Sequence, residues 1–264
     1  MSDLKERHWH EQCAIAEKIG KAGSFQKYAE TLPDILNAVI SKQEVCCIDE
    51  GTPDGIRFAG SGIYYVITQG TEKGKKGKEA IYAGLEAAAE AVKGSPAEFI
   101  TSHDECGAAG LVFNEMPDSI KKEFGTSDNL GIYFAKELSK KTGLGYRHIG
   151  IKEMARPSGM HTAMFAYYDG TGKFNPDAVP GLPQGFVVSR KYLGKEEALR
   201  EIELAPKIAT GEHGYGGLIK PDKKFWLIAV AEDPWALESL VSELKPVSDS
   251  YKGKVKVEGF LVKA

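Results

Sequence analysis

The segment from residue 44 to about residue 110 constrains the fold most, because it contains two short buried strands separated by a long helix. Residues 44–48 form an apolar run that leads into a polar turn, and residues 98–101 form a second such run. Between them, the alanine-rich residues 75–93 predict a helix that ends at Gly94. Two buried strands joined by a helix favour a parallel βαβ crossover. We therefore expect an α/β fold with a mainly parallel β-sheet flanked by helices.

The rest of the chain continues this alternation of helices and strands. Apolar spacing predicts two helices within residues 5–42, separated near Gly20 and Gly23, with Pro33 in the first turn of the second. Residues 155–185 are rich in proline and glycine and predict a long functional or interface loop, within which residues 167–172 favour a strand running into a tight turn more than a binding loop at a dimer interface. We expect a single α/β domain over residues 1–264, divided into N-terminal helices at about 5–42, a βαβ core at about 44–115 and a C-terminal α/β extension at about 116–264.

Composition argues against several classes of function. The net charge is −3, so neither nucleic acid nor an anionic membrane is an expected partner. The chain lacks an apolar run of about 18 residues, and its charged first ten residues do not resemble a secretory signal, so a cytoplasmic location is expected. In the cytoplasm, the four cysteines are better explained as metal ligands, nucleophiles or core residues than as disulfide partners.

Residues that bind metals follow both predicted strands. The first strand leads into Cys47-x-Asp49 and the second into His103-x-x-Cys106. Adjacent parallel strands end at the same edge of a sheet, so these side chains are expected to converge. Two thiolates and one imidazole suit Zn²⁺ and leave its fourth position open, as in catalytic sites. We therefore expect one Zn²⁺ per chain on Cys47, His103 and Cys106, with Asp49 positioned to reach either the ion or its water.

The same residues carry a resemblance to the β-class carbonic anhydrases. Cys-x-Asp followed by His-x-x-Cys-Gly is similar to that family's metal motifs, and residues 57–61 (Arg-Phe-Ala-Gly-Ser) resemble its Arg-Asn-Ala-Gly-Asn segment. Residues 102–108 (Ser-His-Asp-Glu-Cys-Gly-Ala) resemble its Gly-His-Ser-x-Cys-Gly-Ala segment. The resemblance covers residues 44–110 and implies the fold of that family. The sequence after Cys106 is longer than expected for a plain member.

One departure concerns the aspartate. The family pattern is Cys-x-Asp-x-Arg, in which the arginine holds the aspartate off the metal, but this chain has Gly51 at the arginine position. Two hypotheses follow. Either Asp49 becomes a fourth zinc ligand and closes the site, or another arginine replaces the missing one. Arg57, Arg147 and Arg156 are the candidates, with Arg57 foremost.

The resemblance implies a lyase, a carbonic anhydrase (carbonate dehydratase), in which zinc-bound hydroxide reversibly hydrates CO2 to bicarbonate with the help of Asp49. It also implies a homodimer or higher homo-oligomer. Histidine is the natural proton shuttle near neutral pH, and His161 and His213 lie in glycine-rich loops that suit this role. A structural role for each of these histidines is the simpler interpretation.

Three other functions fit parts of the sequence. A hydrolase acting on carbonyl sulfide (COS) or carbon disulfide (CS2) would use the same metal chemistry on another linear molecule. A non-catalytic zinc-binding sensor or partner-binding module would explain the loss of the arginine at position 51. A thiol-redox protein would use Cys46 and Cys47, and would need an exposed, reactive cysteine.

Overall fold

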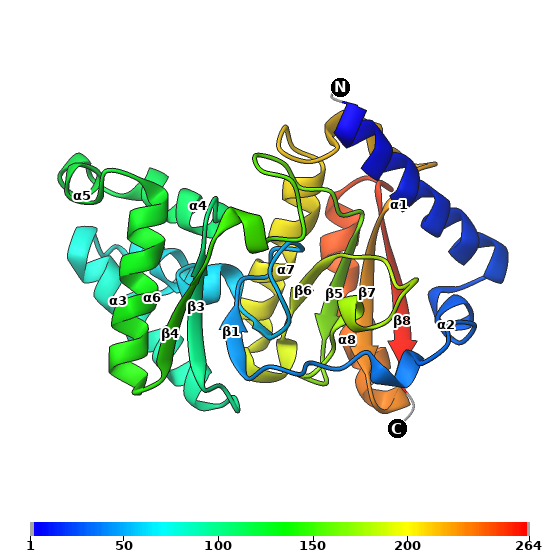
Figure 1. The fold of residues 1–264 in the computed structure, drawn as a ribbon, viewed down its shortest axis with the longest axis horizontal. Coiled ribbons are helices and arrows are strands. Elements are labelled where there is room, and N and C mark those ends of the chain that lie inside the picture. Colours follow the sequence, from blue (N-terminus) through cyan, green and yellow to red (C-terminus); the bar gives the residue numbers. More distant parts are fainter. Residues whose placement is uncertain (1–2, 263–264) are drawn as a thin grey trace. The chain divides into compact units, whose positions relative to one another are not determined.

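The computed structural model describes residues 3–262, and these residues form two compact α/β units (Figure 1). The central unit comprises residues 41–158. The terminal unit comprises the chain up to Ile40 together with the chain from Gly159 onward. The expected α/β class, with parallel strands flanked by helices, is confirmed. The expected division into a single domain over 1–264 differs from this arrangement, because the N-terminal helices join the C-terminal half to make a unit of their own.

The central unit is built on a four-stranded sheet in the order β2-β1-β3-β4, with every neighbouring pair parallel. The short strands β1 and β2 and the longer β3 and β4 are accompanied by four helices, α3 to α6. Their bounds are β1 Glu44–Cys46, β2 Ile56–Arg57, α3 Gly77–Lys93, β3 Phe99–His103, α4 Gly107–Glu115, α5 Asp118–Phe124, α6 Ser127–Thr142 and β4 Gly145–Ile149. The expected parallel connection from β1 through α3 to β3 is therefore present.

Helices α3 and α6 pack against each other, and α6 also packs on β3 and β4 (Figure 1). Helix α3 also packs closely against the helical turn Val66–Gly70. A Cβ atom added at Gly84 of α3 would lie 2.6 Å from the Cγ2 of Val66. Helix α6 begins where the Thr126 side chain accepts the Asn129 N–H, and ends at Gly143, which has a left-handed φ of 74°. These contacts fix β3, whose last residue is His103.

The terminal unit repeats the same kind of sheet. Its order is β6-β5-β7-β8, and all three neighbouring pairs are parallel. The elements are α1 Asp3–Ala22, α2 Phe25–Ala29, β5 Phe165–Asp169, β6 Phe186–Val188, α7 Lys195–Ala209, β7 Phe225–Ala231, α8 Pro234–Ser250 and β8 Val255–Leu261. The last strand, β8, lies at the edge of this sheet.

Two local predictions were wrong. Residues 155–185 are not one long loop, because they contain the fully buried strand β5 at the centre of the terminal sheet. The second N-terminal helix does not begin at Pro33. It is the short α2, capped by Ser24, and only a 3-10 turn follows at Ile35–Asn37. None of the helices within residues 3–262 combines the length and apolar character needed to cross a bilayer.

Candidate metal centre

The three predicted ligands come together at one edge of the central sheet. Cys47 directly follows β1, His103 ends β3, and Cys106 is the N-cap residue of α4. Strands β1 and β3 are parallel neighbours, so both reach this edge at their carboxyl ends. One ligand atom from each residue lies within 4.8 Å of the other two, and all three residues are buried. This grouping has the size of a metal site.

The hydrogen bonds of His103 leave one ring nitrogen available to a metal. Nδ1 lies 2.8 Å from the backbone carbonyl of Asp104, and because a carbonyl only accepts, Nδ1 carries the proton. Once the ring is neutral, Nε2 is a buried acceptor, and apart from its interaction with the Cys47 sulfur it has no hydrogen-bond partner among the described residues. A buried nitrogen with only a weak sulfur partner is costly, and a bound cation removes that cost. The site therefore fits a metal ion.

The thiol of Cys47 is prepared in a similar way. The Gly60 N–H donates to its sulfur over 3.1 Å, which favours the thiolate. A Cβ at Gly60 would lie 3.3 Å from the sulfur of Cys106 and only 2.4 Å from the Cγ2 of Ile63. Gly60 also has a left-handed φ of 56°, so a glycine is required where the backbone passes this close to the sulfurs.

Burial and mutual interaction shift the ionisation of the ligands. Burial, with the neighbouring Cys106 thiol, raises the pKa of Cys47 well above its usual value. Burial lowers the pKa of His103, but the Cys47 thiolate and Asp49 outweigh it and raise that pKa to about 9. Without a cation the site therefore retains protons, and a metal ion would have to displace them.

Asp49 is held by an arginine from far along the chain. Nε of Arg156 lies 2.8 Å and 3.0 Å from the two carboxylate oxygens of Asp49, and the Gly51 N–H donates to Oδ1 over 2.8 Å. Arg156 is fixed in turn, because it also donates to the side chain and backbone carbonyl of Glu105 and to the carbonyl of Pro157. The side chains of Arg156 and Asp49 are only 1% and 3% exposed. Of the two hypotheses for the missing arginine, these contacts favour replacement.

The foremost candidate, Arg57, has a different place. Its guanidinium donates to the backbone carbonyls of Cys47, Asp49 and Thr52, so it braces the loop that carries Asp49. Arg147 forms ion pairs with the side chains of Glu44 and Glu153 and not with Asp49. Arg156 is therefore the arginine that the structure pairs with the Asp49 carboxylate.

Gly51 explains why the arginine arrives from elsewhere. A Cβ atom at position 51 would lie 2.4 Å from Cγ of Arg156 and 3.1 Å from its Cβ and Cδ. The stem of Arg156 thus occupies the space that a side chain at position 51 would need. The glycine at position 51 therefore leaves the space through which the Arg156 side chain reaches Asp49.

The remaining candidates are placed as follows. His161 and His213 belong to the terminal unit, where the His161 N–H donates to the carbonyl of His213 over 2.7 Å, and their role as proton shuttles stays a prediction. Cys46 is fully buried and its sulfur contacts the carbonyl of Asp54, while burial raises its pKa. A buried thiol with a raised pKa lacks the reactivity that the redox alternative requires.

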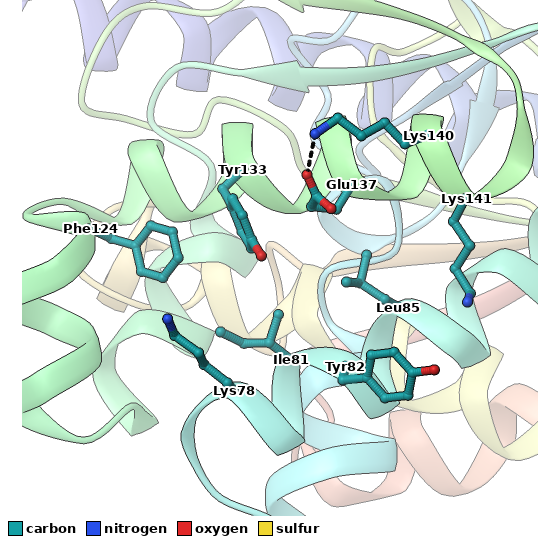
Figure 2. Close-up of a pocket in the computed structure, with 9 residues that line it drawn as sticks. All are labelled: Lys78, Ile81, Tyr82, Leu85, Phe124, Tyr133, Glu137, Lys140 and Lys141. Atoms are coloured by element: carbon teal, nitrogen blue, oxygen red, sulfur yellow. Dashed lines mark hydrogen bonds and ion pairs between the residues drawn. The ribbon is translucent and has the colours of Figure 1, made fainter.

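The central unit also has a surface groove, whose lining includes none of Cys47, His103 and Cys106. It lies between α3 and α6, has a volume of about 500 Å³, and is lined by aliphatic and aromatic side chains under a rim of lysines (Figure 2). Each rim lysine is paired with a glutamate: Lys78 with Glu123, Lys140 with Glu137, and Lys141 with Glu86. Since its charges are already compensated, the groove does not point to a particular ligand.

Comparison of the chain with protein-family models, with curated proteins and with solved structures found no match. The interpretation of the site therefore rests on its own geometry. Sequence reasoning identified the ligands but did not single out Arg156 or Gly60. A signal for Arg156 was the glycine at position 51, because an absent side chain leaves space that another residue can fill.

Proposed function

We propose that this chain is a zinc-dependent carbonic anhydrase that hydrates CO2 reversibly to bicarbonate. The observation that carries the proposal is the buried group Cys47, His103 and Cys106, in which Nε2 of His103 has no hydrogen-bond partner among the described residues apart from the Cys47 sulfur. Two thiolates and an imidazole are the donors that zinc prefers over magnesium or calcium. A zinc ion held there would supply a Lewis acid and a water of lowered pKa, able to attack CO2 near neutral pH.

The chain's own residues prepare the remaining steps. Asp49 lies two residues beyond Cys47, and Arg156 together with the Gly51 N–H fixes its carboxylate. With its charge compensated by Arg156, this carboxylate would accept a hydrogen bond from the attacking water and so orient that water toward CO2. The Asp104 carbonyl keeps the proton of His103 on Nδ1. This leaves Nε2 as the metal ligand.

The pairing of Asp49 also bears on the alternative functions. A zinc-binding sensor needs no open coordination position, whereas a hydrolase for COS or CS2 needs the same open position as a carbonic anhydrase. Arg156 holds both oxygens of Asp49 and thereby opposes closure of the site by that carboxylate. This contact favours an enzyme over a sensor.

The test combines zinc content with stopped-flow hydration of CO2, from about pH 6.5 to about pH 9, around the range in which such a water ionises. We expect about one zinc ion per chain and hydration already near neutral pH. Cys106→Ser is expected to lose both, whereas Cys46→Ala is a matched control, since Cys46 is buried beside the site but lies outside the ligand group. COS is assayed in parallel. Zinc binding with turnover of COS alone would replace the proposed substrate, and absence of zinc would overturn the proposal.

A further inference from the structure

A second cluster of reactive side chains lies on β3 and β4 of the central unit. Oγ of Ser102 is 2.9 Å from Nδ1 of His148, and Nε2 of His148 is 3.1 Å from Oδ1 of Asp104. The hydroxyl of Tyr146 lies 2.8 Å from the same Oγ. None of these four residues belongs to the zinc ligand group. The cluster therefore calls for its own explanation.

Strand register produces this arrangement. Ser102 lies directly opposite His148 in the parallel pairing of β3 with β4, and Ile100 lies opposite Tyr146. Residues two apart on a strand point to the same side, so Tyr146 and His148 both flank Ser102. His103 is the next residue along β3 and points to the other side. The sheet thus separates the cluster from the proposed zinc site.

The chemistry of the partners fixes the direction of every hydrogen bond. A carboxylate only accepts, so Nε2 of His148 donates to Asp104, and the neutral ring then has a lone pair on Nδ1. Ser102 must therefore donate its proton to Nδ1. Its oxygen is left to accept from the Tyr146 hydroxyl. The result is a directed chain, Tyr146 to Ser102 to His148 to Asp104, in which the serine proton is already shared with a base.

The orienting carboxylate is itself held in place. Oδ2 of Asp104 accepts the Ile151 N–H over 2.9 Å, while Oδ1 receives His148. The side chains of His148 and Asp104 are 32% and 35% exposed, and β4 is an edge strand of its sheet. Both side chains are therefore accessible to solvent. Ser102, at 7% exposed, lies just beneath His148.

We propose that Ser102, His148 and Asp104 form a second reactive centre, with Ser102 as a nucleophile toward small activated carboxylic esters. Nucleophile, base and orienting group stand in the order that serine hydrolases of unrelated folds share. The Tyr146 hydroxyl, 2.8 Å from Oγ, donates to the serine oxygen and so keeps the serine proton directed at His148. This centre uses other side chains than the proposed zinc site, and the two sites share only the Asp104 residue, whose backbone carbonyl accepts from His103.

The reaction balances on these residues. Oγ of Ser102 adds to the ester carbonyl carbon while its proton passes to Nδ1 of His148. The ester C–O bond then breaks, and the departing alcohol oxygen takes that proton. Water next attacks the acyl group on Ser102. Its proton passes through Nδ1 to Oγ, which releases the carboxylic acid and restores the serine.

Diisopropyl fluorophosphate tests the nucleophile directly on the full-length, zinc-loaded chain. Oγ displaces fluoride from phosphorus and keeps the phosphoryl group, so intact mass and peptide mapping report the residue that reacted. We expect a single adduct on Ser102. Ser139 serves as an internal control, because it is also buried but donates to the Leu144 carbonyl and has no histidine partner. Water at a zinc site would hydrolyse the reagent without leaving an adduct.

His148→Gln separates base catalysis from simple accessibility. Glutamine can still donate to Asp104 and accept from Ser102 but cannot take up the proton, so we expect the labelling rate to fall by about 100-fold or more. Labelling at another residue, no labelling of the wild-type chain, or an unchanged rate in a folded His148→Gln variant would each overturn the proposal. The wild-type result needs no variant, so a folding defect in His148→Gln leaves the test decisive. None of these results bears on zinc content or CO2 hydration.

Discussion

The two units of this chain have the same strand order, but different side chains follow their strands. Both sheets are parallel, and both place their first strand second, their second strand at one edge and their last strand at the other. Each first strand leads to a buried aspartate, Asp49 or Asp169, that accepts the N–H of the residue two positions later over 2.8 Å. The framework around the two aspartates is therefore comparable.

The ligand positions of the two units differ completely. When Asp49 is aligned with Asp169, Cys47 corresponds to Tyr167. The registers of β1 with β3 and of β5 with β7 then make Ile100 correspond to Trp226. By the same offset, His103 and Cys106 correspond to Ala229 and Glu232. Tyr167 is fully buried and donates to the Pro183 carbonyl. Both parallel sheets have such a carboxyl edge, but only the central unit has Cys47, His103 and Cys106 there as candidate metal ligands.

The aspartates also differ in how their charge is compensated. Asp49 pairs with the guanidinium of Arg156, whereas Asp169 accepts the N–H and hydroxyl of Thr171 and the N–H of Phe174. Burial, only partly offset by these neutral donors, raises the pKa of Asp169. Asp49, which is proposed to act on the substrate, thus lies beside a full positive charge. Asp169, which closes a turn, accepts hydrogen bonds from the neutral groups of Thr171 and Phe174.

The largest expected effect comes from removing a ligand. Cys106→Ser should lower bound zinc from about one ion per chain toward none and reduce CO2 hydration to the uncatalysed rate. The corresponding change in the terminal unit, Glu232→Ser, removes only a surface pair with Lys173 and should leave both unchanged. Elemental analysis and stopped-flow assays check both variants. Equal zinc content in the two would break the comparison.

The next largest effect, a loss of stability, is expected when the Arg156 side chain is removed. Arg156→Ala leaves the buried Asp49 without its cation, and we expect a loss of about 3–5 kcal/mol in the free energy of unfolding. Thr171→Ala removes one neutral hydrogen bond from Asp169 and should cost about 1 kcal/mol. Urea unfolding of both variants measures the contrast. A smaller loss for Arg156→Ala than for Thr171→Ala would contradict the roles assigned to the two contacts.

A double variant sharpens the same comparison. Gly51→Arg alone should fail, because the new Cβ would lie 2.4 Å from Cγ of Arg156. Combined with Arg156→Ala, the arginine at position 51 has space and a carboxylate within reach, so the double variant should recover stability and hydration relative to Arg156→Ala. Recovery shows that the guanidinium acts and not its position in the chain. Absence of recovery in a folded double variant would reject this interchange.

Zinc binding should depend on pH through the ligands of the central unit. The raised pKa values of Cys47 and His103 mean that the metal-free site holds protons at neutral pH, and zinc must displace them. Zinc affinity is therefore expected to rise with pH, by roughly tenfold per pH unit for each proton released. Competition with a chromophoric chelator at several pH values measures it. A flat profile would show that the thiols are already ionised.

The smallest effect is expected at Asp169. Its pKa is raised in the folded chain, so the stability associated with it is present at low pH and lost as pH rises through that folded pKa. Asp169→Asn lacks this titration, although it also forfeits the hydrogen bond from Phe174, a constant loss of about 1 kcal/mol. The difference in unfolding free energy between variant and parent should therefore move in favour of the variant as pH increases. The opposite slope would show that the pKa of Asp169 is lowered.

The grouping of Cys47, His103 and Cys106 was predictable from sequence because of one geometric rule. Strands joined by a helix crossover run parallel, so residues at their carboxyl ends meet even when far apart in the chain. Cys47 and His103 obey this rule, and Cys106 begins the following helix. Arg156 follows no such rule, since it reaches Asp49 from 107 residues away on an irregular segment. Its role depends on tertiary packing over Gly51.

The second unit was hidden by composition. Prolines and glycines over residues 155–185 predicted a loop, although residues 167–172 within it favoured a strand running into a turn, and that strand is present as β5, fully buried between β6 and β7. Helix α7 was also missed. Because the N-terminal helices join this late sheet, the two-unit division is a long-range property that local periodicity along the chain does not encode.

The most direct test of the proposed function is a zinc titration of the full-length, metal-depleted chain followed by its rate of CO2 hydration. We expect the rate to rise in proportion to added zinc and to stop rising at about one ion per chain, while Cys106→Ser stays at the uncatalysed rate throughout. Zinc uptake without any increase in hydration, or no uptake at all, would contradict it.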